Sequence, residues 1–321
     1  MSTPSSVSPT PRLGVALGSG SARGWAHIGV LQVMAEAGLK PQFITGSSIG
    51  ALVGAAAAAG QLRSLEAWVT RLDWWDILRY AVRPTGAGLA DGARLMDAYV
   101  ERVGEWRIED LPVRFAAVAT DLGTGREVWL REGEAREAVR ASIALPGLFA
   151  PVQKEGRWLV DGGIVDPVPV SLCRALGAEV VVAVNLNHDI LQRFDLPRPR
   201  AQGGSDFVGR LGQQLQRTLG VSVPGLPDAG EVDPGAVTAP GVFDVLAGSM
   251  SIMQDRITRS RMAGDPPELL INPPLQDVAM MDHHRAAEVI EVGRRAAKGA
   301  VDGLLEQYPE LCQSRPAEGG G

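Results

Sequence analysis

The first sixty residues alternate strand-like and helix-like patterns, and this alternation constrains the fold more than any other feature. Residues Leu13–Leu17 form a short apolar run typical of a buried strand, and the helical repeat of apolar residues after it closes at Gly38. A second strand-like run at 42–45 leads into an alanine-rich helical stretch at 51–59. Strands that alternate with helices favour a mostly parallel sheet, so we expect an α/β fold.

Later segments continue the alternation. The sequence predicts strands at 115–120, 127–130, 157–160, 179–184 and 269–271, with the first two joined as a hairpin. It predicts helices at 65–72, 91–104, 134–142, 168–176, 243–262 and 282–305. We therefore expect one three-layer α/β/α domain over residues 13–312, with a mostly parallel central sheet and helices on both faces.

Three segments lack the pattern of a packed core. Residues 1–12 are rich in Ser, Thr and Pro and contain no apolar run, so we expect a disordered leader rather than a secretory signal. Residues 195–240 hold many Gly, Pro, Gln and Arg residues, and we interpret them as an insertion or mobile flap over one face. Residues 313–321 are expected to form a loose tail.

The composition argues against several classes of protein. The 321 residues are 45% hydrophobic and 21% charged, as in ordinary globular chains, and the net charge of −6 argues against nucleic-acid binding. The two cysteines, Cys173 and Cys312, are far apart and lack metal-ligand spacing, which favours a reducing cytosol and no disulfide framework. No stretch reaches 18 apolar residues, so the chain is not expected to cross a membrane.

The segment Gly46-Ser47-Ser48-Ile49-Gly50 has the form of a nucleophile elbow with Ser48 at its apex. A serine on a tight turn between strand and helix presents its Oγ outward, and the amides of the helix N-terminus favour developing negative charge. Gly46 and Gly50 fit this turn, because a β-carbon there would crowd the neighbouring backbone. A lone G-x-S-x-G can arise by chance in a chain with 39 glycines, so the surrounding strand and helix carry the prediction.

The glycine-rich turn Gly18-Ser19-Gly20-Ser21-Ala22-Arg23-Gly24 follows the first strand and admits three interpretations. A dinucleotide-binding fingerprint is disfavoured, because Arg23 stands where a third glycine is needed and the next strand ends without a carboxylate. An ordinary tight turn would only connect strand to helix. Successive backbone N–H groups could instead form an oxyanion hole, which we favour because the elbow lies close by on the same predicted sheet.

Two further stretches each admit a functional and a structural interpretation. Asp161-Gly162-Gly163 follows a predicted strand, and a carboxylate at a strand's carboxyl end is well placed for chemistry at the open edge of an α/β sheet. The alternative is an Asx turn in which Asp161 only accepts backbone N–H groups. The adjacent Trp74 and Trp75 could form an interfacial or acyl-binding surface, or pack in the core as most tryptophans do.

In this order, the glycine-rich turn, the elbow and the Asp-Gly-Gly segment resemble the patatin-like phospholipase family, most closely its bacterial branch related to neuropathy target esterase. The resemblance covers about residues 13–184 and includes 140–147, 166–170 and the C-terminal helix. It implies a Ser-Asp dyad, with Ser48 as nucleophile and Asp161 as general base.

The same resemblance implies that the turn from Gly18 through Ser21, including Ser19 and Gly20, supplies the oxyanion-hole donors. Arg23 would help to hold that turn, and Gly162 and Gly163 would support Asp161 as Gly46 and Gly50 support Ser48. Ser19 stands where many family members have glycine, but a backbone donor does not require glycine.

The implied reaction is hydrolysis of a carboxylic ester of a phospholipid or lysophospholipid through an acyl-enzyme on Ser48. Aspartate is a poor base near neutrality at its usual pKa of about 3.9, but burial beside Ser48 would raise that pKa. We expect no cofactor and no metal, since no acidic loop has calcium-binding spacing. We expect a cytoplasmic protein whose only membrane contact is peripheral, at the inner membrane surface. The sequence makes no prediction of oligomeric state.

Three rival hypotheses remain open. An α/β-hydrolase triad in the order Ser, Asp, His could use Ser48, Asp161 and either His283 or His284. The other histidines fit it less well, because His27 is expected to be structural and His188 lies in a predicted loop. The chain could also be a regulatory or scaffold protein that keeps the fold with little turnover, or a nucleotide-binding protein.

Overall fold

The computed structural model describes residues 10–72, 92–188 and 242–312. In this part of the chain an eight-stranded sheet forms the centre, with strand order β5-β6-β3-β2-β1-β7-β8 and with β4 paired to β3. The strands are β1 Leu13–Leu17, β2 Phe43–Ser47, β3 Arg114–Asp121, β4 Glu127–Leu130, β5 Val152–Lys154, β6 Arg157–Asp161, β7 Val180–Val184 and β8 Leu269–Ile271.

The prediction of a mostly parallel central sheet is confirmed. β1 runs parallel to β2 and β7, β2 to β3, and β7 to β8. The predicted hairpin of β3 and β4 is also present. β6 also pairs antiparallel with β3, and it pairs antiparallel with β5, a strand that the sequence did not predict. Glu155 and Gly156 join β5 to β6 with φ of 49° and 77°, the backbone form that short hairpins favour.

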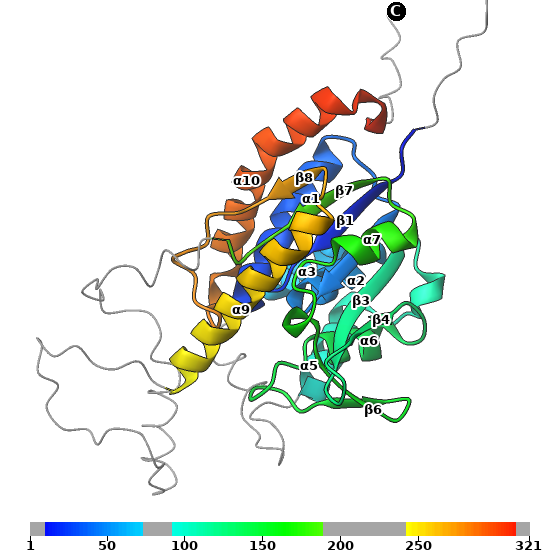
Figure 1. The fold of residues 1–321 in the computed structure, drawn as a ribbon. Coiled ribbons are helices and arrows are strands. Elements are labelled where there is room, and N and C mark those ends of the chain that lie inside the picture. Colours follow the sequence, from blue (N-terminus) through cyan, green and yellow to red (C-terminus); the bar gives the residue numbers. More distant parts are fainter. Residues whose placement is uncertain (1–9, 73–91, 189–241, 313–321) are drawn as a thin grey trace, which may run out of the picture.

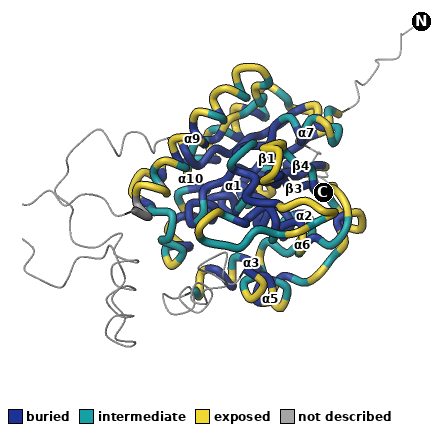
Figure 2. Tube along the Cα trace, turned by 60° about the horizontal axis from the view of Figure 1, so that its bottom comes forward, coloured by how far each residue is buried: buried dark blue, intermediate teal, exposed yellow. Residues whose placement is uncertain are grey.

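Helices cover both faces of the sheet, which gives the expected three layers (Figure 1). The main helices are α1 Ala26–Glu36, α2 Ile49–Ala58, α3 Leu62–Val69, α5 Gly92–Val103, α6 Ala135–Ser142, α7 Val170–Leu176, α9 Val242–Gly264 and α10 Ala286–Gln307. Figure 2 shows that the buried residues gather along the strands and the inner sides of these helices.

Alternation along the central strands decides which helices each face meets. Leu13, Val15 and Leu17 of β1 belong to the apolar cluster that includes α1, α2 and α10. Ala16, between two of them, belongs to a separate cluster with residues of α7. Because successive strand residues point to opposite faces, the continuous apolar run in β1 is explained by a sheet buried on both sides.

The helices α1 and α10 cross in direct backbone contact. A Cβ built on Gly29 would lie 2.0 Å from the carbonyl oxygen of Ile290, and one built on Gly293 would lie 2.1 Å from that of Ala26. No other residue fits at such a crossing, so these two glycines set the separation of the helices. This contact fixes the C-terminal helix against the first βα unit.

Several predictions lie outside the described residues: Trp74 and Trp75, residue 91 at the start of the predicted helix 91–104, the insertion at 195–240 and the tail at 313–321. The leader lies outside them as far as residue 9. Arg12, which we placed in the leader, is part of the fold, because its backbone N–H donates to Glu179 Oε2 at 2.9 Å. No helix among the described residues is both long and apolar enough to span a bilayer.

Candidate active site

Ser48 stands between β2 and α2, where the chain turns sharply. Its φ of 57° and ψ of −123° lie outside the conformations that a side chain usually allows, as expected for the apex of a nucleophile elbow. A Cβ on Gly46 would lie 2.3 Å from the carbonyl oxygen of Gly50, and one on Gly50 would lie 2.2 Å from that of Leu17. These close approaches explain why glycine flanks the serine on both sides.

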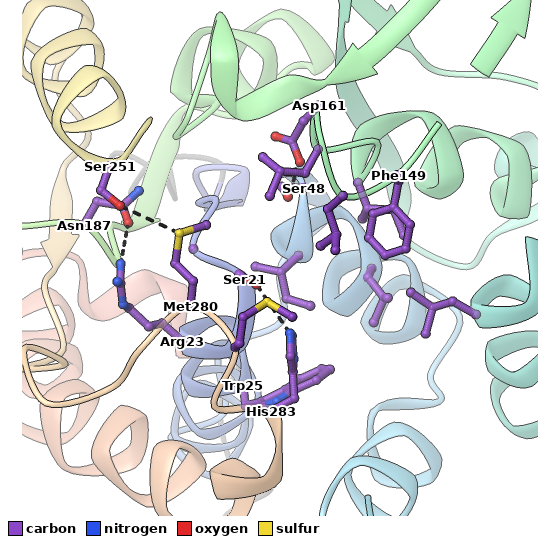
Figure 3. Close-up of a pocket in the computed structure, with 18 of the residues that line it drawn as sticks. Ser21, Arg23, Trp25, Ser48, Phe149, Asp161, Asn187, Ser251, Met280 and His283 are labelled. Atoms are coloured by element: carbon purple, nitrogen blue, oxygen red, sulfur yellow. Dashed lines mark hydrogen bonds between the residues drawn. The ribbon is translucent and has the colours of Figure 1, made fainter. Parts of the chain in front are cut away.

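Asp161 meets this serine across the sheet. The Ser48 hydroxyl donates a hydrogen bond of 2.6 Å to Asp161 Oδ2, although 113 positions separate the two residues in the chain. Figure 3 shows the two side chains together at one end of the pocket. The short O···O distance is typical of a bond to a charged acceptor.

The route by which Asp161 arrives differs from the prediction. We expected it at the carboxyl edge of the sheet because it ends a strand, but β6 is antiparallel, so its carboxyl end points away from that edge. The register accounts for the meeting: Ser47 is paired with Val118 of β3, and Asp161 is paired with the next residue, Ala119. β3 therefore aligns the ends of β2 and β6 at one level.

Both interpretations of Asp161 are present in the structure. Its Oδ1 accepts the N–H of Gly163 at 2.7 Å, as in an Asx turn, while its Oδ2 accepts the Ser48 hydroxyl. Its backbone carbonyl accepts the Thr120 hydroxyl at 2.8 Å. Burial raises the pKa of Asp161 to about 6, although the bonds from Ser48 and Gly163 favour the charged form.

The glycine-rich turn offers fewer free donors than predicted. The N–H of Gly18 donates to the carbonyl of Val184 at 3.0 Å, and that of Ser19 donates to the carbonyl of Pro167 at 2.8 Å. These two amides are therefore occupied, which corrects their assignment to an oxyanion hole. Gly20 and Ser21 do line the pocket beside Ser48, and they begin a 3-10 helix, where amide groups have no partner within the helix.

Arg23 holds this turn from within the protein. Its guanidinium is buried and donates to the carbonyl of Val278 at 3.0 Å and to Asn187 Oδ1 at 3.2 Å. The amide of Asn187 in turn donates to Gln254 Oε1 at 3.0 Å. The predicted supporting role of Arg23 agrees with these contacts, but Asn187 and Gln254 were not predicted, because their network joins three distant segments.

Another residue that the sequence did not single out, Ser142, holds the elbow in place. The buried hydroxyl of Ser142, at the end of α6, accepts the backbone N–H of Ser48 at 2.9 Å. This amide is therefore also occupied. The stretch 140–147 belonged to the family resemblance, and that likeness was the available signal for Ser142.

Ser48 and Asp161 open into a pocket of about 130 Å³ with two unlike walls (Figure 3). One wall is apolar and comes from α2, α3, α5 and the segment after α6: Leu52, Trp68, Leu72, Leu95, Ile143, Leu145, Leu148 and Phe149. The other side carries the polar groups, Ser21, Arg23, Asn187, Ser251, Gln254 and His283, beside the apolar Trp25, Met280 and Met281. A pocket with one apolar side and a few polar groups suits an amphipathic ligand.

The histidines make contacts other than those of a triad. The ring Nε2–H of buried His27 donates to the carbonyl of Gly18 at 2.8 Å, which agrees with a structural role, and burial lowers its pKa to about 4. His283 lines the pocket, but its Nε2 lies 3.4 Å from Ser21 Oγ and its ring packs edge-on against Trp25. Loss of solvent lowers the pKa of His283 to about 4.

Helix α9 clamps the segment that follows Asp161. Arg261 donates to the carbonyl of Val165 at 3.0 Å and to Glu127 at 2.5 Å, and its Nη1 lies 3.5 Å from the buried carboxylate of Asp166. Burial raises the pKa of Asp166 to about 7. Gly162 and Gly163 lie between these anchors and Ser48, and a Cβ on Gly162 would lie 2.2 Å from the carbonyl oxygen of Val118.

Among the described residues no cluster of His, Cys, Asp and Glu could hold a metal ion.

Comparison with known proteins assigns this arrangement to a family. The family model for patatin-like phospholipases matches residues 15–174, a range that contains the glycine-rich turn, Ser48 and Asp161. An uncharacterized NTE family protein of Mycobacterium tuberculosis is 36% identical over 345 residues, covering 92% of each chain. Lysophospholipase NTE1 of Pyricularia oryzae is 28% identical over 297 residues, covering 88% of this chain and 18% of the fungal protein. The crystal structure of VipD from Legionella pneumophila covers 96% of this chain and 82% of its own, at a TM-score of 0.35 and 11% identity.

Proposed function

Because this chain belongs to the patatin-like phospholipase family and is similar to its NTE members, we propose that it is a serine lipid acyl hydrolase. Its substrates are carboxylic esters of phospholipids or lysophospholipids. The observation that carries the proposal is the hydrogen bond of 2.6 Å from Ser48 Oγ to Asp161 Oδ2 at the end of a mostly apolar pocket. The name of the fungal relative, a lysophospholipase, supports the substrate class.

In the first half-reaction Ser48 Oγ attacks the ester carbonyl while Asp161 accepts the hydroxyl proton. The carbonyl π electrons move onto oxygen, and the amides of Gly20 and Ser21 meet that oxyanion. When the tetrahedral intermediate collapses, the bond to the alcohol breaks and Asp161 returns the proton to the leaving oxygen. The product is an alcohol or lysolipid, and the acyl group stays on Ser48.

In the second half-reaction a water molecule gives its proton to Asp161 and attacks the acyl carbon. Collapse of the second intermediate breaks the acyl–Oγ bond, returns the proton to Ser48 and releases a fatty acid. The base must be ionised in both halves. With a pKa of about 6, Asp161 is largely ionised near pH 7 and still more basic than an exposed carboxylate.

The test measures hydrolysis of p-nitrophenyl esters and lysophospholipids, together with covalent labelling by a fluorophosphonate. We expect Ser48→Ala to lose the label and to lower kcat by about a thousandfold or more, and Asp161→Asn to weaken both. Ser47→Ala is the matched control, because the neighbouring Ser47 is a serine of the same turn that is buried and lies outside the pocket lining. A folded wild-type protein that neither reacts with the probe nor hydrolyses any ester would refute the proposal and favour a regulatory role.

The same assays separate the dyad from a triad. Changing both His283 and His284 to Ala removes the histidines that fit the triad order. We expect the double variant to keep its label and most of its kcat for a soluble ester, because Asp161 already receives the Ser48 hydroxyl directly. Loss of labelling in a folded double variant would show that a histidine is the base.

A further inference from the structure

Helix α9 carries its polar and apolar side chains on the opposite sides from those expected of a surface helix. Ser251, Gln254, Asp255 and Thr258 are buried against the protein. Val245, Leu246, Ile252 and Met253 are exposed, with exposed fractions between 39% and 59%. A helix on a water-soluble surface normally buries its apolar stripe, so this helix is inverted.

The exposed apolar residues share one face of the helix. At 100° per residue, positions 245, 246, 252, 253 and 256 fall within an arc of about 120°. Arg256 is also exposed and extends that face by one turn toward the carboxyl end. In Figure 2 the outer arcs of α9 are drawn as exposed, and Figure 1 shows its amino-terminal end at the margin of the fold. We call Val245, Leu246, Ile252, Met253 and Arg256 the outer face.

The buried polar side of α9 is explained by the site. Ser251 and Gln254 line the pocket, and Gln254 accepts the amide of Asn187. Arg261 anchors the segment after Asp161. These contacts account for Ser251, Gln254 and Arg261 on the inner side, but they do not explain why the outer face is apolar. An apolar stripe on the solvent side is costly unless another apolar phase covers it.

Two observations indicate what covers the outer face. Apart from the exposed Ser249 it is apolar along its amino-terminal half and it ends in a guanidinium, the arrangement of helices that lie in a lipid interface with Arg beside the phosphates. The opposite side of the same helix lines the pocket, so a surface touching the outer face lies about one helix diameter from the pocket that Ser48 and Asp161 also line. A lipid substrate then has a short path from that surface to the dyad.

We propose that the outer face of α9 docks on an anionic lipid surface and brings the pocket to its substrate. The choice of a lipid surface rests on the proposed function, whereas the inverted helix does not. Docking transfers four apolar side chains from water into the acyl boundary and sets Arg256 among the phosphates. The net charge of −6 on the whole chain opposes this contact, so the attraction is local to the helix.

The test is flotation of the full-length Ser48→Ala protein with vesicles of phosphatidylcholine alone or with 30% phosphatidylglycerol. The Ser48→Ala background removes turnover, so binding is measured even if the enzyme proposal fails. We expect binding to the anionic vesicles, a loss of about tenfold or more in the double variant Leu246→Glu, Met253→Glu, and a smaller loss in Arg256→Gln. Leu122→Glu is the matched control, because Leu122 is 57% exposed but lies in the turn after β3.

A parallel measurement checks that the double variant is intact. Built in the active protein, Leu246→Glu, Met253→Glu should keep wild-type hydrolysis of a soluble short-chain ester and lose hydrolysis of the same ester bond in vesicles. Vesicle binding equal to that of the parent protein would overturn the proposal, as would a parent that binds neither vesicle. A parent that is dimeric in solution and becomes monomeric on the double substitution would overturn it in favour of a second copy as the occupant.

Discussion

The consecutive helices α9 and α10 have nearly the same length, but they bury opposite kinds of side chain. α10 buries apolar and small residues, among them Val289, Ile290 and Val301, and directs its charges to solvent. α9 buries Gln254 and Thr258 and exposes its apolar residues. One helix is placed by close packing against α1, and the other by polar contacts to the candidate active site.

This difference predicts that residues around α10 determine mainly stability, whereas residues around α9 and Asp161 determine mainly activity. Around α10, substitution should act through packing, and activity should change only when the fold does. Around α9 and Asp161, under the proposed function, we expect substitution of buried polar groups to change activity more than stability. The three predictions below test that division, from the largest expected effect to the smallest.

The largest effect should come from the crossing of α1 and α10. Gly293→Ala places a methyl group 2.1 Å from the carbonyl oxygen of Ala26, so the helices must separate, and we expect unfolding free energy to fall by about 3 kcal/mol. Gly299→Ala, in the same helix with open space around it, should instead raise it by up to about 1 kcal/mol. Equal changes in the unfolding free energy of Gly293→Ala and Gly299→Ala, measured by chemical denaturation, would contradict the packing role of the crossing.

Asp161 should cost stability when it is charged. Its pKa in the fold, about 6, is above its ordinary value of 3.8, so the folded protein binds this proton more tightly than the unfolded chain does. The resulting contribution to the free energy of unfolding is fully present below about pH 4 and is lost as pH rises through about 6. Asp161→Asn should therefore match the wild type near pH 4 and be more stable at pH 8, by up to about 3 kcal/mol.

Asp121 supplies a control of opposite sign. The N–H of Gly123 donates to Asp121 Oδ1 at 2.9 Å and lowers the pKa of that carboxyl. Its stabilising contribution is present above its ordinary pKa and is lost in acid, so Asp121→Asn should destabilise the protein at pH 8. Denaturation at both pH values checks both variants. A less stable Asp161→Asn at pH 8 would contradict the assigned cost.

The smallest effect should come from the clamp on α9. Arg261→Ala removes the donors to Val165 and Glu127 and loosens the segment after Asp161, so we expect kcat for a soluble ester to fall by about tenfold with KM unchanged. Arg261→Lys should recover part of kcat. Arg259→Ala, on the same helix, removes an ion pair of 2.8 Å to Asp255 but leaves the contacts to Val165 and Glu127, so kcat should be unchanged. A fall in melting temperature without a change in kcat would make Arg261 structural only.

Local pattern was sufficient for most of the fold and for Ser48, whereas the role of Asp161 came from the order of three motifs that the family shares. Each parallel strand and its helix is a self-contained signal in the sequence, and the elbow around Ser48 is defined by glycines that its own turn requires. β5 was not predicted, because a strand of three residues is too short to show periodicity in the sequence. It forms only by pairing with β6. Arg12 escaped because its partner, Glu179, is 167 positions away.

The amino-acid sequence by itself determined the alternation of strands and helices and the elbow that carries Ser48, because each depends on neighbouring residues, and the family resemblance supplied Asp161 as the candidate partner. Only the tertiary structure decided that β6 runs antiparallel, that the amides of Gly18 and Ser19 are occupied, and that α9 turns its polar side inward. These depend on which atoms the folded chain brings together, and no local pattern records a partner a hundred residues away.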